Sequence, residues 1–281
     1  MKSLRFSRKH LGIPYFLFLV LFVVFPLLLI IFYAFTRVDP EGLFTLSGVK
    51  VSITFDNFIE FFTKSSNVRV LFISFGLAIV TTVICLIIAY PLAYILAKSK
   101  LNKNGVLLIL FILPMWINFV LRTAAMKELL FAIGMYSSNR LSFVNTVIGM
   151  VYDYLPFVIL PLYTVMIKLD KSYLEASADL GSTPANTFFR VTLPLTVPGI
   201  VSAVTMVLLP TTTSYVVSDT LGNGNVTIIG KVIESQFSTV FDWHAGSAIA
   251  MVLLVIIFIT MFITNKFTDD EGSQARGSGL W

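Results

Sequence analysis

The chain has 281 residues, of which 57% are hydrophobic and only 12% are charged, and its mean hydropathy is +0.88. A soluble globular domain carries about 25% charged residues, so the composition excludes that class and indicates a polytopic membrane protein. The formal net charge of +5 does not indicate a nucleic-acid partner. Most basic residues flank long apolar segments, which is where membrane proteins place them.

Six segments reach the roughly 20 mostly apolar residues that a transmembrane helix needs. The first is too long for the apolar part of a signal peptide, so we interpret it as an uncleaved helix. The predicted spans are 13–35, 70–96, 105–121, 144–167, 196–217 and 245–264. The sequence therefore predicts an all-α polytopic membrane protein that forms a single transmembrane domain over 1–281.

Basic residues gather in alternate loops, which predicts the orientation of the chain. The basic loops carry Lys2, Arg5, Arg8 and Lys9, then Lys98, Lys100 and Lys103, then Lys168, Lys171 and Arg190. The loops between them hold most of the acidic residues. Both termini and the 168–195 loop are therefore expected in the cytoplasm.

The sequence contains no recognisable catalytic or metal-binding set. Its one cysteine, Cys85, lies in an apolar run, and its two histidines, His10 and His244, do not form a metal-binding motif. The segment "GNVTIIGKV" at 224–232 resembles a P-loop but has one residue too many between its glycines, and Val232 replaces the hydroxyl that would hold magnesium. The sequence therefore predicts neither an intramembrane enzyme nor an ATP site in this chain.

The polar stretch "KSYLEASADLGSTPANTFFRVTLP" at 171–194 has the features of an ordered helix–turn–helix. Ser172 stands three residues before Glu175, the spacing of a capping box. Gly181 is placed to end the first helix in a left-handed conformation. Ser182 or Thr183 then caps a second helix that has Pro184 at its first position and ends before Pro194.

The same stretch resembles the EAA loop of ABC-importer permeases of type I. Glu175, Ala176, Gly181, Val191, Leu193 and Pro194 match its pattern, while Ser177 stands where alanine is usual and Val191 where isoleucine is usual. The segments "LPLYTVMIKLDKSYLEASADLG", "RVTLPLTVPGIVSAVTMVLLP" and "YVVSDTLG" extend the resemblance to the spermidine/putrescine permease family, in particular to its first permease subunit. The resemblance covers nearly the whole chain and is weakest over 122–143 and at both termini.

The resemblance implies a six-helix type I permease in which a five-helix core follows a first helix that wraps the partner subunit. It implies a homologous second permease, two cytoplasmic ATPase subunits that bind ATP and magnesium, and an extracytoplasmic polyamine-binding protein. The residues it assigns to ATPase coupling are Glu175, Ala176, Ser177, Asp179, Gly181, Leu193 and Pro194. Glu175 can cap its own helix or contact a basic residue of the ATPase, and both alternatives stay open.

Asp153 is the one acidic residue well inside a predicted span. A charge in the bilayer normally faces a partner or a water-filled path. It can attract a cation on the translocation route, hydrogen-bond in protonated form to a neighbouring helix, or pair with the second permease. This position is often apolar in the family, so the role of Asp153 is our inference from the residue itself.

Further path candidates lie in later segments. Thr212, Tyr215 and Asp219 follow one another at helical spacing, although hydroxyls also bond back to their own helix. Trp116 and Asn118 offer an aromatic face and an amide, with an interface anchor as the alternative for Trp116. Glu234 is a weaker candidate in an outer loop.

The leading hypothesis is a bacterial inner-membrane permease that imports polyamines together with a separate ATPase. The alternatives are the same architecture for an amino acid, a sulfate or an iron chelate, and a proton-coupled transporter that uses Asp153. Asp153 and Asp219 disfavour an anionic solute, because like charges on the path repel it.

Overall fold

The computed structural model describes residues 8–39, 44–46, 49–99, 102, 105–136 and 138–277. Lys2, Arg5, Lys100 and Lys103, on which the predicted orientation partly rests, lie outside these ranges. The chain divides into two compact units, which are Met1–Val68 with Val232–Ile256 and Arg69–Lys231 with Ile257–Trp281.

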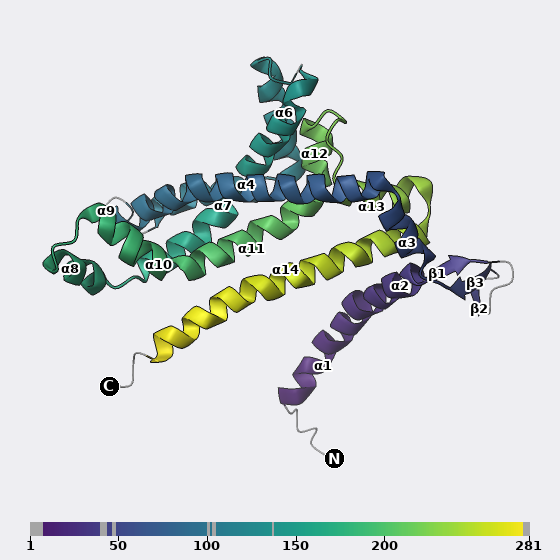
Figure 1. Cartoon of the computed structure of the whole chain (residues 1–281), viewed down its shortest axis with the longest axis horizontal. Coiled ribbons are helices and arrows are strands. Elements are labelled where there is room, and N and C mark those ends of the chain that lie inside the picture. Colours follow the sequence, from purple (N-terminus) through teal and green to yellow (C-terminus); the bar gives the residue numbers. More distant parts are fainter. Residues whose placement is uncertain are drawn as a thin grey trace, which may run out of the picture. The chain divides into compact units, whose positions relative to one another are not determined.

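Helices dominate the described chain (Figure 1). The helical elements of its first half are α1 (Arg8–Leu19), the π-helix η1 (Val20–Val24), α2 (Phe25–Ala34), α3 (Asp56–Thr63), α4 (Ser65–Lys98), α5 (Val106–Ile112), the 3-10 helix η3 (Leu113–Trp116) and α6 (Phe119–Ala132). Those of its second half are the 3-10 helix η4 (Asn139–Leu141), α7 (Ser142–Ile167), α8 (Lys171–Asp179), α9 (Pro184–Thr187), the π-helix η5 (Phe188–Thr192), α10 (Leu193–Leu195), α11 (Val197–Thr213), α12 (Tyr215–Leu221), α13 (Ile229–Ser235), the π-helix η6 (Gln236–Val240) and α14 (Trp243–Gly277).

A small antiparallel sheet in the first unit adds to the predicted all-α fold. Its strands β1 (Thr36–Val38), β2 (Phe44–Leu46) and β3 (Val49–Ile53) lie in the order β1-β3-β2, with Thr36 opposite Ile53 and Phe44 opposite Val51. Alternating Val, Ser and Ile in β3 favour a strand. The side-chain amide of Asn57 in α3 donates to the carbonyls of Ala34 and Thr36 at 3.1 and 2.9 Å, which ties the sheet to the end of α2.

The described residues contain four unbroken helices that are long and apolar enough to cross a membrane. These are Pro14–Ala34, Ser65–Lys98, Asn139–Ile167 and Trp243–Thr264. Two further pairs qualify as bent spans, which are Val106–Trp116 with Phe119–Ala132 at 93° and Pro184–Leu195 with Val197–Thr213 at 61°. The predicted helical membrane fold is confirmed, and the count of six holds when each bent pair is one span.

The structure interrupts the predicted spans 105–121 and 196–217, each of which was predicted as one helix. The first is interrupted before Asn118, whose side-chain oxygen accepts from the amides of Val120 and Leu121 and so starts α6. The second is interrupted at Ser214, which has φ −73° and ψ 63° and separates α11 from α12. Hydropathy alone does not reveal such breaks, because it reports which residues are apolar and not the path of the backbone.

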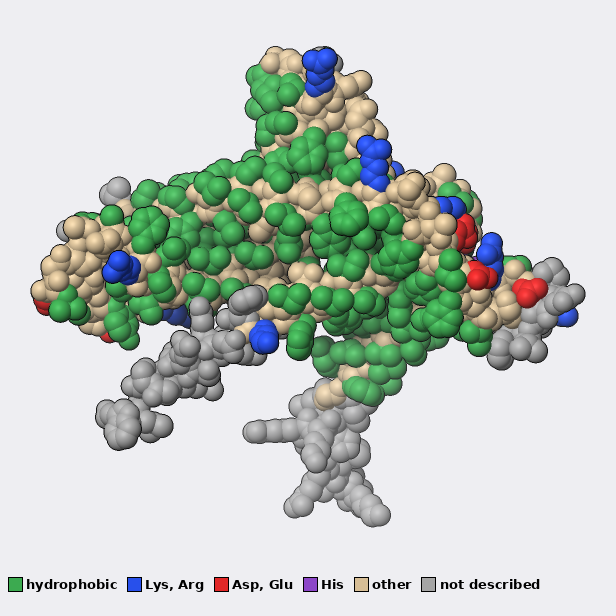
Figure 2. All heavy atoms as spheres, in the orientation of Figure 1, with side chains coloured by type: hydrophobic (Ala, Val, Ile, Leu, Met, Phe, Trp, Pro, Cys, Tyr) green, Lys and Arg blue, Asp and Glu red, His purple; other side chains and the backbone are tan. Residues whose placement is uncertain are grey.

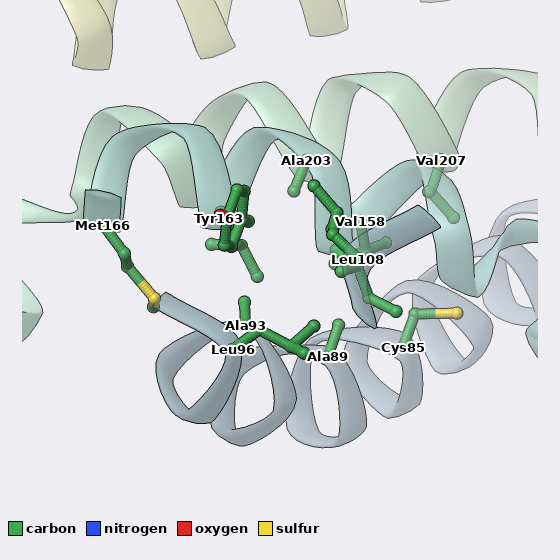
Figure 3. Close-up of a cluster of buried hydrophobic side chains, with 12 residues drawn as sticks. Cys85, Ala89, Ala93, Leu96, Leu108, Val158, Tyr163, Met166, Ala203 and Val207 are labelled. Carbon is green, nitrogen blue, oxygen red and sulfur yellow. The ribbon is translucent and has the colours of Figure 1, made fainter. Parts of the chain in front are cut away.

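The core of the second unit joins α4, α5, α7 and α11. Small side chains let these helices approach closely, as is usual in membranes. Ala89, Ala93 and Ala203 are fully buried beside Val158 and Leu108 (Figure 3). In contrast, hydrophobic side chains cover much of the visible face over α4 and α11, as a lipid-facing surface requires (Figure 2).

Gly230 in α13 lies against the break between α11 and α12. A Cβ atom added at this position would lie only 2.4 Å from the Thr213 carbonyl oxygen. Since backbone cannot move aside as a side chain can, glycine is required here for close approach.

We therefore expect Gly230→Ala to lower the free energy of unfolding by about 1–3 kcal/mol through overpacking. Thermal unfolding of the detergent-solubilised protein measures this as a lower midpoint. Gly76→Ala in α4 is the matched control, because nothing lies within 4 Å of its added Cβ. Equal midpoints for the two variants would contradict the prediction.

Candidate functional site

The polar loop begins with helix α8, and its cap differs from the predicted one. The N-cap is Asp170, whose side chain accepts from the Ser172 amide at 3.0 Å. This hydrogen bond from the backbone lowers the pKa of the Asp170 carboxyl. The predicted capping box of Ser172 and Glu175 is therefore wrong, because a better acceptor stands two residues before Ser172.

The turn after α8 has the predicted chemistry. Gly181 has φ +76°, its amide donates to the Ala178 carbonyl, and the Ser182 amide donates to the Ser177 carbonyl. These two bonds form a Schellman motif. Thr183 then caps α9 by accepting from the Asn186 amide, and Pro184 follows at the first helical position. Of the two predicted caps, the structure uses Thr183.

Ser177 joins the two helices of the loop. Its hydroxyl lies 3.0 Å from the Thr187 hydroxyl in α9, so the serine that departs from the EAA pattern makes a hydrogen bond that alanine cannot. This bond fixes the angle between α8 and α9 from inside the loop.

The second loop helix does not end before Pro194, in contrast to the prediction. After α9, the π-helical turn η5 carries the chain directly into α10, which contains Leu193 and Pro194. A wide π turn accommodates a proline that cannot donate a backbone hydrogen bond. The bend falls at Thr196 instead, where α11 begins.

Aromatic rings attach the loop to α4. Phe188 of η5 makes edge contacts with Tyr90 and Tyr94, each at a centroid distance of 5.7 Å. The Tyr90 hydroxyl also lies 2.8 Å from the Thr196 hydroxyl. The loop is therefore held both at its second helix and at the start of α11.

The outer face of α8 is left exposed. Glu175, Ala176 and Asp179 are all exposed, and no ion pair of the described chain involves either carboxylate. Leu180, at the end of this face, is 89% exposed. With Asp170 as the cap, the Glu175 carboxylate is left available for another molecule.

A cavity of about 430 Å³ lies where the two helix breaks meet. Its lining combines one ion pair with several aromatic rings and backbone at the breaks, and consists of Met115, Ile117, Phe119, Arg122, Asp153, Tyr154, Phe157, Pro210, Thr213, Ser214, Tyr215 and Val216. Non-helical backbone at membrane depth is tolerated where it lines such a cavity.

Asp153 pairs with an arginine of the same chain. Arg122 Nε lies 2.8 Å from Asp153 Oδ1, and the two side chains are 5% and 1% exposed. The Thr123 hydroxyl donates to Asp153 Oδ2 at 3.1 Å, while Arg122 Nη1 donates to the Pro114 carbonyl at 2.9 Å. The structure therefore gives Asp153 an ion pair within its own chain. The alternatives predicted for Asp153 did not include such a pair.

Arg122 is the functional residue that the sequence analysis missed. It lies just beyond the predicted span 105–121 and was given no role there. The available signal was the need of Asp153 for a cationic partner within the same chain. The bent span brings that partner into the membrane region.

The remaining predicted path residues are dispersed. Tyr215 lines the cavity, but Thr212 is buried and donates to the Leu208 carbonyl. Asp219 is half exposed and pairs with Lys231 at 3.2 Å. Because the helix breaks at Ser214, the expected continuous stripe through these residues does not exist.

Trp116 and Asn118 lie outside the cavity lining. Trp116 is 84% exposed, in agreement with an interface anchor. The Asn118 oxygen is used as the cap of α6. Glu234, which belongs to the first unit, accepts from the Ser238 hydroxyl at 2.6 Å.

Two solved structures with a similar fold are ABC transporters. A bacterial transporter for the import of the acidic polysaccharide alginate aligns with a TM-score of 0.71 at 15% identity, over 92% of this chain and 95% of that one. The MetNI methionine ABC transporter aligns with a TM-score of 0.54 at 17% identity, over 72% of this chain and 94% of that one. At these identities the likeness shows the fold alone.

Sequence relatives are more specific. The spermidine/putrescine transport system permease protein PotB of Haemophilus influenzae is 35% identical over 88% of this chain and 89% of its own length. PotB of Escherichia coli is 35% identical over 87% and 92%. The family described as binding-protein-dependent transport system inner membrane component matches residues 89–265. The chain therefore belongs to this family of inner-membrane transport components, and within it to the spermidine/putrescine permease branch.

Proposed function

We propose that the chain is the first permease subunit of an ABC importer that moves polyamines into the cytoplasm. The observation that carries this proposal is the 35% identity to spermidine/putrescine permeases over nearly the whole length of both chains. The same architecture for an amino acid, a sulfate or an iron chelate is the alternative. Such a chain conducts solute and performs no covalent chemistry.

The two carboxylates that were expected to disfavour an anionic solute are both paired with cations. Asp153 is neutralised by Arg122, and Asp219 is paired with Lys231. Neither carboxylate is left to repel an anion along the path. The polyamine assignment therefore depends on the relatives and on the aromatic cavity.

The cavity suits a flexible cation because of its rings. Phe119, Tyr154, Phe157 and Tyr215 line it, and the faces of aromatic rings attract alkylammonium groups. Both oxygens of Asp153 are engaged by neighbouring side chains. We therefore assign the solute contacts to the aromatic faces. The ion pair is a fixed neighbour of these rings.

The 168–195 loop is assigned to energy coupling. Its exposed α8 face, with Glu175, Ala176 and Asp179, would seat in a separate ATPase subunit that binds ATP and magnesium. A second homologous permease, two ATPase subunits and an extracytoplasmic polyamine-binding protein complete the assembly. Both termini and this loop then lie on the cytoplasmic side of the bacterial inner membrane, as the basic loops predict.

Glu175→Lys is expected to abolish uptake, because it reverses the charge of an exposed carboxylate that does not cap its own helix. The measurement is uptake of labelled spermidine and putrescine by cells deleted for the gene and complemented with each variant. Glu128→Lys, the same change at an exposed site on α6, is the control and keeps uptake. Full uptake by Glu175→Lys at equal membrane levels contradicts the coupling role.

Tyr215→Ala is expected to raise the apparent KM for spermidine about 2- to 30-fold, the range of one cation–π contact. Tyr215→Phe keeps the ring and is expected to stay within about twofold of wild type. Trp116→Ala removes an exposed ring outside the cavity and serves as the control. An unchanged KM for Tyr215→Ala would contradict the assignment of the cavity to the solute path. Absence of polyamine uptake by wild type would contradict the assignment of polyamines as the solute.

Asp153→Asn is expected to destabilise the protein by about 3–5 kcal/mol, since it leaves the buried Arg122 charge unpaired. The double variant Asp153→Leu with Arg122→Met removes both charges and is expected to recover most of that loss. Thermal midpoints and membrane levels measure this recovery. If the double variant is stable but transports nothing, the pair has a role in transport beyond holding α6 to α7.

A further inference from the structure

A second pocket, of about 390 Å³, lies between the coupling loop and the ends of two membrane helices. Lys98 and Tyr94 reach it from α4, Ile167 from α7, Lys171 and Glu175 from α8, and Thr192 from η5. This pocket shares no lining residue with the aromatic cavity, and Glu175 alone among the three residues assigned to the ATPase contact also lines it.

The lining of the pocket has an excess of positive charge. Lys98 lies 4.3 Å above the centre of the Tyr94 ring and donates to its hydroxyl. Among the described residues, neither Lys98 nor Lys171 forms an ion pair. Glu175 is the single lining carboxylate, and the nearby Asp170 is engaged as the cap of α8 without lining the pocket. Two cations against one anion favour an anionic ligand.

Thr192 supplies an independent sign of a ligand. Thr192 is only 3% exposed, and its hydroxyl has no hydrogen-bond partner within the described chain. A buried hydroxyl left without a partner costs about 1–3 kcal/mol. A ligand that offers oxygen atoms in the pocket would satisfy it.

The position of the pocket indicates where that ligand comes from. The candidate spans Ser65–Lys98 and Asn139–Ile167 end at this pocket, which places it at the level of the lipid headgroups. Basic pockets between helices at this level bind anionic headgroups. Ile167 and Leu174 give the pocket an apolar side that matches the glycerol and upper acyl region of a phospholipid.

We propose that this pocket binds the phosphate of an anionic phospholipid such as phosphatidylglycerol. Lys98 and Lys171 hold the phosphate charge, and the Thr192 hydroxyl donates to a phosphate oxygen. The lipid then bridges α8 to the ends of α4 and α7. If the lipid binds here, lipid composition tunes coupling to the ATPase. This consequence rests on the proposed function, whereas the lipid binding itself does not.

The test is native mass spectrometry of the purified full chain incubated with phosphatidylglycerol. Because each lysine near an anionic group contributes about fivefold, Lys98→Gln with Lys171→Gln is expected to lower lipid retention roughly 10- to 30-fold. Thr192→Val, which keeps the side-chain shape, is expected to lower it severalfold. Lys50→Gln with Lys127→Gln removes the same charge elsewhere and keeps retention at the wild-type level.

Excess inorganic phosphate distinguishes the two sources of the phosphate group. If the lipid stays bound in excess inorganic phosphate, the site is assigned to the lipid. If phosphate displaces the lipid and phosphate binding depends on the same two lysines, the pocket is assigned to free phosphate and the lipid proposal is overturned. Equal retention by wild type and by both pocket variants, at unchanged thermal midpoints, overturns the site altogether. None of these measurements uses transport, so they separate this proposal from the polyamine assignment.

Discussion

The constraint on which the second unit depends is that backbone polar groups in a membrane must be satisfied within the protein. In two apolar segments the helix is interrupted, once before Asn118 and once at Ser214. Both breaks reach the same cavity, where Ile117 and Ser214 are lining residues. The cavity is therefore a consequence of the breaks, because irregular backbone is stable at that depth only beside protein or a polar space.

The ion pair between Arg122 and Asp153 follows from the same geometry. The bend before α6 carries Arg122 back to the middle of α7, where its guanidinium also bonds the Pro114 carbonyl beside the break. Arg122 thus adds a second hydrogen bond to the Pro114 carbonyl, which also accepts from the Ile117 amide at 3.2 Å, and neutralises a buried carboxylate. A charge that looked like a binding group in the sequence serves first to hold the bent span in place.

The sequence predicted local features well where one residue type is strongly preferred. Gly181 was identified, and the second cap was narrowed to Ser182 or Thr183, because a left-handed turn and a helix cap each have a narrow choice of residues. The start of α8 was misassigned since Asp170 and Ser172 are both good caps, and only the three-dimensional path of the chain selects between them. The breaks and Arg122 were missed because hydropathy reports which residues are apolar and not where a helix turns.

The 168–195 loop is connected to the membrane helices by contacts that the motif alone does not contain. Ser177 bonds Thr187, Phe188 lies against Tyr90 and Tyr94, and Tyr90 in turn bonds Thr196 at the start of α11. These contacts form one physical route from α8 to both α4 and α11. Since α11 ends at the cavity, a displacement of α8 would reach the lining residues Thr213 and Ser214 through a helix and not through a flexible loop. A packed core of alanines around Ala93 and Ala203 leaves little space to absorb such a displacement locally, so α4, α7 and α11 are suited to move together.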